Sequence, residues 1–186
     1  MTLEKIEKEI QGCQLCGLAE SRTNIVFGYG NPGAKLMLIG EGPGKEEDIQ
    51  GKPFVGSAGQ LLDKILAAAE IEREEVYIAN VVKCRPPKNR VPQRKEAKAC
   101  LPWLWQQIET LSPKIVVLLG GTALQNLIKP DARITKLRGQ WMESKSGIKI
   151  MPTFHPAALL RDPNRKKPVW EDFQKIRDEY KKIKGE

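Results

Sequence analysis

Three side chains with catalytic potential each lie at the end of an apolar segment of this sequence. Glu41 follows the apolar residues 36–39, Asn80 lies near the end of an apolar run, and His155 follows another one. A carboxylate, an amide and an imidazole can together recognise a polar ring, stabilise charge on it and position water. His155 is the only histidine among 186 residues, so a metal site with two histidines is excluded and this imidazole is free for catalysis.

The four cysteines form a second group of chemical interest. Cys13 and Cys16 are a C-x2-C pair flanked by glycines, and Cys84 is separated from Cys100 by 15 residues. A reducing cytoplasm disfavours disulfides, and no strand precedes the C-x2-C pair as it would in a thioredoxin-like motif. One metal site with four thiolates is therefore favoured over four buried thiols. The wide second spacing favours an iron–sulfur cluster but leaves zinc open.

Two glycine-rich segments look like nucleotide-binding loops but do not match the required patterns. Residues 28–33 read G-x-G-x-x-G, yet they precede the first strong strand. Gly40 and Gly44 are too close together for a P-loop, and Lys45 is followed by glutamate instead of serine or threonine. The acidic residues around them would repel phosphate. We expect instead a flexible acidic loop that binds a flat, neutral ligand through backbone N–H groups.

Strands and helices alternate along the chain and must position these residues. Continuous runs of Val, Ile and Leu predict buried strands at 35–40, 75–82, 114–120 and 148–154. Helical spacing of apolar residues predicts helices at 57–70, 96–111, 122–128 and 169–184. Ser57 is a candidate N-cap for the first of these helices.

The alternation predicts the α/β class, with a three-layer α/β/α sandwich around a parallel sheet of about four strands. We find no linker or repeat and expect a single domain over residues 1–186. Ligands of such sheets bind beyond the carboxyl ends of the strands. Glu41, Asn80 and His155 would all lie at that edge.

The chain is basic, with 31 Lys and Arg against 23 Asp and Glu and a net charge of +8. Basic residues cluster at 83–98 and 161–167, which favours a surface that binds the nucleic-acid backbone. The alternative is that the excess positive charge only keeps the protein soluble. No apolar run approaches the ~20 residues that cross a membrane. The N-terminus lacks the pattern of a secretory signal. We therefore expect a cytoplasmic protein that acts as a monomer.

Three segments and the cysteine spacing closely resemble the family 4 uracil-DNA glycosylases, the iron–sulfur members of the uracil-DNA glycosylase superfamily. The segments are residues 40–59, 76–90 and 152–161, in the order of the family, and the resemblance spans Cys13 to Arg161. It implies a [4Fe–4S] cluster on the four cysteines, which would tie the N-terminal segment to the 84–100 region. It also implies hydrolysis of the N-glycosidic bond of uracil flipped out of DNA, which leaves an abasic site for base excision repair.

For the substrate, the resemblance implies a pocket that reads the edges of one extruded base. Asn80 would accept a hydrogen bond from N3–H and donate one to O4, a pattern that cytosine reverses. His155 would donate to O2 as negative charge builds on the departing base. Phe54 would stack on the ring, although packing beneath the loop suits it equally well. The backbone contacts to uracil would come from Gly40, Glu41 and Gly42.

This chain departs from the better-known family 1 enzymes at Gly42, where they have an aspartate. We expect Glu41 to position water and to stabilise the sugar cation. Glu47 is the alternative acid, or the wall that excludes the methyl group of thymine. Leu159 aligns with the wedge that fills the vacated base stack, with ordinary helix packing as the alternative, and Arg161 would bind a phosphate.

A different class of function remains compatible with the cysteines and the charge. A non-catalytic zinc module with four cysteine ligands could bind nucleic acid without any chemistry. A colourless protein that contains zinc and lacks acid-labile sulfide would favour this alternative. A brown protein with broad visible absorbance would favour iron–sulfur.

Overall fold

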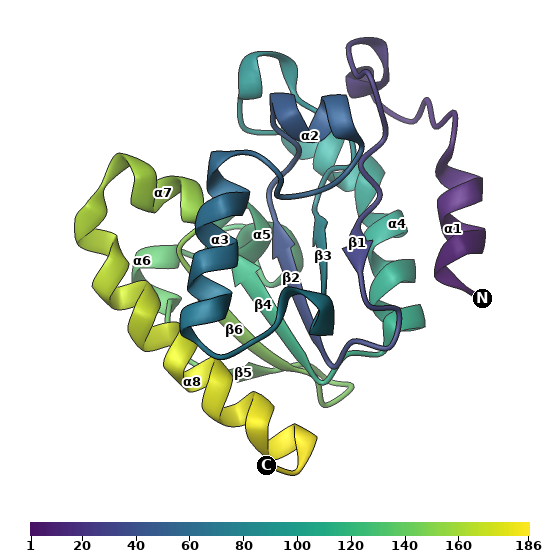
Figure 1. Cartoon of the computed structure of the whole chain (residues 1–186). Helices are drawn as coiled ribbons and strands as arrows, with labels where there is room; N and C mark the ends of the chain where they lie inside the picture. The colour runs from purple at the N-terminus through teal and green to yellow at the C-terminus, as the bar shows by residue number, and fades with distance from the viewer.

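The computed structural model describes residues 1–186 and has an α/β/α architecture around one sheet (Figure 1). The six strands lie in the order β1-β3-β2-β4-β6-β5. The four central strands are parallel and are the four predicted ones, shortened by one or two residues at their ends. They are β2 (Leu36–Gly40), β3 (Val76–Asn80), β4 (Ile115–Leu119) and β6 (Lys149–Thr153).

Two short edge strands enlarge the sheet beyond the predicted four strands. β1 (Tyr29–Gly30) pairs antiparallel with β3, and β5 (Met142–Glu143) pairs antiparallel with β6. Two residues are too few to show an alternating pattern, so the sequence gives no signal for them. A Cβ atom on Gly30 would lie 2.1 Å from the carbonyl oxygen of Val76. The glycines of residues 28–33 thus include one that strand packing requires.

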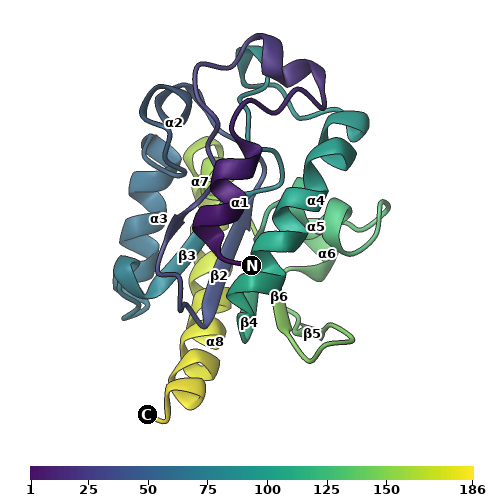
Figure 2. The same ribbon diagram turned by 90° about the vertical axis from the view of Figure 1, so that its right-hand side faces the viewer.

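Both faces of the sheet are buried, which confirms the α/β/α sandwich. Leu36 and Leu38 of β2 belong to the apolar core on one face, whereas Met37 and Ile39 belong to the core on the other, and all four are 0% exposed. Figures 1 and 2 show the helices on the two sides. One side holds α3 (Ser57–Ala68), α7 (Pro156–Arg161) and α8 (Lys166–Lys184), and the other holds α1 (Leu3–Ile10), α4 (Arg94–Leu111) and α5 (Gly121–Leu127).

Helix starts differ from the predicted ones where local contacts decide them. The N-cap of α3 is Gly56, so Ser57 is the first helical residue and its prediction as N-cap is wrong. α4 begins two residues before the predicted start, because Gln93 and Glu96 form a capping box. The expected flexible acidic loop is also wrong in part, since it contains the helix α2 (Lys45–Gln50). The remaining elements are α6 (Ile134–Leu137) and the 3-10 turns Gly17–Glu20, Arg73–Glu75, Pro87–Asn89 and Pro163–Arg165.

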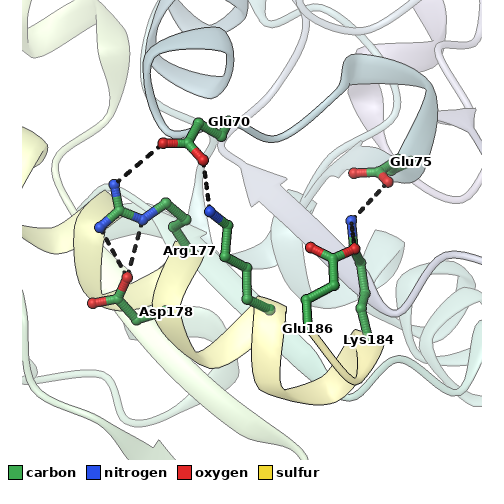
Figure 3. A network of polar contacts seen from close by, with 7 residues as sticks. Glu70, Glu75, Arg177, Asp178, Lys184 and Glu186 are labelled. Carbon is green, nitrogen blue, oxygen red and sulfur yellow. Dashed lines mark hydrogen bonds and ion pairs between the residues drawn. The ribbon is translucent and has the colours of Figure 1, made fainter.

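The C-terminal helix α8 is attached to the sandwich by one buried and one exposed set of polar contacts. Asp172 is 0% exposed, pairs with Arg138 and accepts a hydrogen bond from the hydroxyl of Thr153 at 2.6 Å. This contact fixes the end of β6, two residues before His155. Figure 3 shows the exposed set, in which lysines and arginine of α8 contact Glu70 and Glu75 near the far end of α3. Exposed pairs of this kind contribute little stability. No helix has the length and apolar character needed to span a membrane.

Candidate active site

A cavity of about 730 Å³ lies at the carboxyl ends of the parallel strands. Gly40 and Asn80 are paired in register at the ends of β2 and β3, and the ends of β4 and β6 complete the rim. The structure therefore brings together side chains that lie far apart in the sequence. The predicted residues that line the cavity are Glu41, Gly42, Glu47, Phe54, Asn80, His155 and Arg161.

The side chain of Asn80 is buried without a partner for its oxygen. Asn80 is 1% exposed, and its Oδ1 accepts no hydrogen bond within the protein. A buried polar atom of this kind typically costs about 1–3 kcal/mol unless a ligand satisfies it. A Cβ atom on Gly40 would lie 2.6 Å from this oxygen and 2.7 Å from Cζ of Phe54. Any residue with a Cβ atom at position 40 would clash with the Asn80 amide and the Phe54 ring, so this position requires glycine.

Phe54 packs into the core beneath the loop and also lines the cavity, and its stacking on a substrate ring stays a prediction. It is 6% exposed and belongs to the apolar core that includes α3. Its φ of +54° is in the left-handed region, which is costly for an aromatic residue. The Phe54 ring stacks against the ring of His155, with centroids 5.4 Å apart and an interplanar angle of 29°.

His155 is held as a neutral imidazole with one defined donor. It is the N-cap of α7, where its Nδ1 accepts a hydrogen bond from the N–H of Ala157 at 3.0 Å. An accepting Nδ1 carries no proton, so the proton lies on Nε2. Burial, and then the positive charge of Arg161, lower the pKa of His155 to about 4. At neutral pH this residue is an uncharged hydrogen-bond donor at the cavity.

The acidic residues of the first loop have separate tasks. The carboxylate of Glu41 accepts a hydrogen bond from the Thr122 hydroxyl at 2.5 Å. Oε1 of Glu47 accepts from the N–H groups of Val55 and Gly56, the two residues that follow Phe54.

Asp48, the next residue after Glu47, has a purely structural task. It is 4% exposed, and its Oδ1 accepts from the N–H groups of Thr23 and Asn24 at 2.9 and 3.2 Å. Together with Glu46 and Glu47 it lies in the first turn of α2, where negative charge is favourable. Much of the loop's acidity is therefore structural, and Glu41 alone follows the strand end directly.

The amino-acid sequence matches a known protein family over most of its length. The model of the "Uracil DNA glycosylase superfamily" matches residues 27–175. The chain belongs to the uracil-DNA glycosylase superfamily. A type-4 uracil-DNA glycosylase of Thermotoga maritima is 44% identical over 183 residues, which cover 97% of this chain and 95% of the relative. One of Sulfurisphaera tokodaii is 45% identical over 185 residues, covering 95% of this chain and 84% of the relative.

Similarity extends to a third type-4 uracil-DNA glycosylase, that of Archaeoglobus fulgidus. It is 40% identical over 182 residues, which cover 94% of this chain and 92% of the relative. Within the superfamily, the chain therefore belongs with the type-4 uracil-DNA glycosylases. The identification rests on nearly the full length of the chain, including the N-terminal segment that carries Cys13 and Cys16.

Leu159, the residue predicted to insert into the DNA base stack, is buried instead of exposed. Leu159 is 2% exposed and packs in the core on the α3 side, so the expectation that it acts as a wedge is wrong. The next residue, Leu160, is 52% exposed. In a helix, consecutive side chains point in different directions, and the sequence pattern did not settle which leucine faces out. Arg161 is exposed beside it, as a phosphate-binding residue would be.

The four cysteines, which are far apart in the sequence, lie together in the structure. Cys13, Cys16, Cys84 and Cys100 line one cavity of about 20 Å³, and all four are free thiols. Arg22 lies beside them, with its guanidinium 3.5 Å from Sγ of Cys84. Burial raises the pKa of Cys84 and raises that of Cys100 to about 11. Burial therefore favours the neutral thiol at Cys84 and Cys100, and a bound metal would favour the thiolate instead.

Sequence reasoning missed three residues that line the same cavity or flank it. Thr122 and Arg165 line it, and Leu160 belongs to α7, of which Ala157, Ala158 and Arg161 line it. Arg165 lies over the ring of Phe154 at 4.5 Å. The only signal for Thr122 was its place directly after the two glycines that follow β4. The rule that ligands bind at strand ends could have found it.

Proposed function

We propose that the chain is a monofunctional uracil-DNA glycosylase, a hydrolase that removes uracil from DNA and leaves an abasic site for base excision repair. Its similarity to three proteins named type-4 uracil-DNA glycosylases supports this activity. The observation that carries the proposal is the unpartnered, buried amide oxygen of Asn80, which shares a cavity with the neutral imidazole of His155.

Uracil is the base whose edge complements this pair of side chains. Oδ1 of Asn80 accepts from N3–H, and the amide nitrogen donates to O4. Cytosine has an acceptor and a donor in the opposite places, so it leaves two buried polar groups unmatched, at about 1–3 kcal/mol each. The Phe54 ring provides a stacking face. Main-chain groups of Gly40, Glu41 and Gly42 contact a carbonyl of the base.

Bond cleavage is assisted from the side of the base and from the side of the sugar. As the C1′–N1 bond breaks, its electron pair moves into uracil and negative charge grows on O2. The Nε2–H of His155 donates to that oxygen, and a preformed donor stabilises developing charge by a few kcal/mol. The sugar becomes cationic, and the carboxylate of Glu41 stabilises it and positions the water that adds to C1′.

Glu47 serves as the wall of the pocket, and Glu41 serves as the acid. One oxygen of Glu47 is engaged by the N–H groups of Val55 and Gly56, so this residue braces the turn that holds Phe54. Its side chain lines the cavity, where it limits the space for a methyl group such as that of thymine. Glu41 has no such engagement with the backbone of that turn.

DNA is bound by the basic rim around the cavity. Leu160 takes the place of Leu159 as the side chain that fills the vacated base stack, because it is the exposed one of the two. Arg161 and Arg165 line the rim of the cavity and bind phosphates. The net charge of +8 favours the approach to DNA.

The four cysteines hold a [4Fe–4S] cluster. All four cysteines line one cavity, so residues far apart in the sequence lie together there. The wide spacing of Cys84 and Cys100 and the similarity to type-4 uracil-DNA glycosylases support a cluster over the zinc of a non-catalytic module. The cluster ties the N-terminal segment to β3 and α4 and supports the basic segment after Cys84. A monomeric state and a cytoplasmic location remain predictions.

The experiment is incubation with an oligonucleotide that contains one uracil, followed by alkali and gel analysis. Wild-type protein should produce an abasic site that alkali cleaves, and it should not cut the strand by itself. Asn80→Ala and His155→Ala should each lower the single-turnover rate by at least about tenfold, since each removes a group worth a few kcal/mol in the transition state. Release of no uracil by the wild type would refute the proposal.

A further inference from the structure

The side chain that holds Glu41 comes from another strand end. Oγ1 of Thr122 donates to Oε2 of Glu41 at 2.5 Å. No other hydrogen bond and no ion pair joins the Glu41 carboxylate to the protein, so Oε1 has no protein donor. Both residues line the cavity and are half-buried. The carboxylate is thus fixed through one oxygen and open through the other.

The fold places Thr122 at this position through the turn between β4 and α5. Gly120 follows the last residue of β4 and has a φ of +92°, and a Cβ atom there would lie 3.0 Å from Cβ of His155. Only glycine fits both constraints easily. The chain then enters α5 at Gly121, and Nδ2 of Asn126 donates to the carbonyl oxygen of Thr122 at 2.8 Å. The same turn therefore contacts His155 and fixes the hydroxyl that reaches Glu41.

The contact also bridges the point where the strand order changes direction. From β2 the chain goes to β3 on one side and then returns to β4 on the other side. Sheets of this class bind ligands in the crevice at such a point. Glu41 follows β2 and Thr122 follows β4, so their hydrogen bond joins the two walls of that crevice.

We propose that Thr122 is the positioning residue for Glu41, which rests on the proposed glycosylase function. A hydroxyl has one proton to donate, and Thr122 commits it to Oε2, which leaves the lone pairs of Oε1 for the attacking water. Water oxygen then bonds to C1′ while the C1′–N1 bond breaks and its electron pair leaves with uracil. The proton lost by water passes to Oε1 of Glu41, and it is later returned through solvent to the uracil anion.

A purely structural tie between α5 and the loop after β2 is the competing explanation. The two explanations differ in what depends on Glu41. If Thr122 positions Glu41, its substitution lowers the excision rate only while the Glu41 carboxylate is present, and DNA affinity is unchanged. If the contact is only a structural tie, the substitution destabilises the protein whatever residue is at position 41. Double-variant measurements separate these cases.

The test compares single-turnover rates of uracil excision and affinities for an oligonucleotide with a non-cleavable uracil analogue. Thr122→Val keeps the shape and removes the hydroxyl, and Thr122→Ser keeps the hydroxyl. Thr135→Val is the matched control, because Thr135 is exposed on α6 and does not line the cavity. If valine disturbs folding, as judged by circular dichroism, Thr122→Ala replaces it. Each Thr122 substitution is also made together with Glu41→Gln.

We expect Thr122→Val to slow excision about tenfold at unchanged affinity, as for loss of a hydrogen bond to a charged group. Thr122→Ser should restore the rate to within about twofold of wild type, and Thr122→Val should add no loss to Glu41→Gln. A wild-type rate in Thr122→Val would overturn the inference, and so would an equal loss in the Glu41→Gln background or full activity of Glu41→Gln alone. In all three cases the wild type still excises uracil, so the proposed function stands; an inactive wild type would refute that function instead.

Discussion

At the scale of single residues, the fold holds three groups of the cavity in unusual states. The oxygen of Asn80 is buried without a partner, Phe54 has a left-handed backbone conformation, and His155 is kept neutral. The first two states cost folding free energy, and the third costs it below about pH 6.5; active sites are where proteins retain such costs. A bound uracil would satisfy the amide and use the donor on His155.

The depressed pKa of His155 predicts a pH dependence of stability. The ordinary pKa of histidine is about 6.5, and burial lowers it to about 4 in the folded protein. Between these values the unfolded chain binds a proton that the folded chain does not bind, so stability is complete above pH 6.5 and falls as the pH drops towards 4. The loss from this residue should reach about 2–3 kcal/mol.

Urea unfolding of wild type and His155→Gln at pH 7 and pH 4.5 measures this effect. Other ionisable groups contribute equally to both proteins, so the difference between the two pH-dependent losses isolates His155. We expect wild type to lose about 2 kcal/mol more than the variant. Equal losses in the two proteins would show that the imidazole is not held neutral.

Single residues also show what the sequence can and cannot predict. Asn80 and His155 were predictable because one ends a recognisable buried strand and the other follows one closely, and the ends of parallel strands meet at one edge. The same rule could have indicated Thr122, which follows β4, but not its hydrogen bond to Glu41, because that contact depends on the turn geometry at Gly120. The tasks of Glu47 and Asp48 depend on hydrogen bonds to distant backbone groups, which no local pattern reveals.

At the scale of elements, the short helix α7 decides which of two consecutive leucines is exposed. The sequence pair Leu159–Leu160 offers two candidates, and a six-residue helix has too few turns for a periodic pattern to choose between them. Packing against the core on the α3 side buries Leu159 and turns Leu160 outwards. The strands were predicted well for the opposite reason, since long apolar runs define them.

This arrangement predicts opposite effects for the two leucines. Leu159→Ala should lower the free energy of unfolding by about 2–5 kcal/mol, as for a large-to-small change in a core. Leu160→Ala should leave stability nearly unchanged and slow excision from double-stranded DNA more than from single-stranded DNA, because only a duplex has a stack to fill. Chemical unfolding and single-turnover assays measure both effects. Wild-type excision from duplex DNA by Leu160→Ala would contradict the assignment.

At the scale of the whole molecule, the two sites lie at different places on one framework. The cysteine cavity joins the N-terminal segment to residues after β3 and within α4, while the base cavity lies at the strand ends. β3 serves both sites, since Asn80 ends it and Cys84 follows shortly after. The fully buried Lys83 donates to the carbonyl oxygen of Asn80 at 3.0 Å, which stiffens this connection.

A structural cluster should not change the chemistry of base excision when its oxidation state changes. We expect the protein to be brown as isolated, and reduction or oxidation of an intact cluster should leave the single-turnover rate unchanged at constant DNA affinity. Removal of the cluster should instead lower thermal stability and DNA binding, because the N-terminal segment loses its attachment. A rate that follows the oxidation state while affinity stays constant would contradict a structural role.

The most direct measurement is a crystal structure of the protein with uracil bound. The account predicts uracil in the cavity at the strand ends, with its N3–H and O4 on the Asn80 amide, its ring against Phe54 and its O2 facing Nε2 of His155. Uracil bound at another place, or bound in this cavity without contact to Asn80, would contradict it.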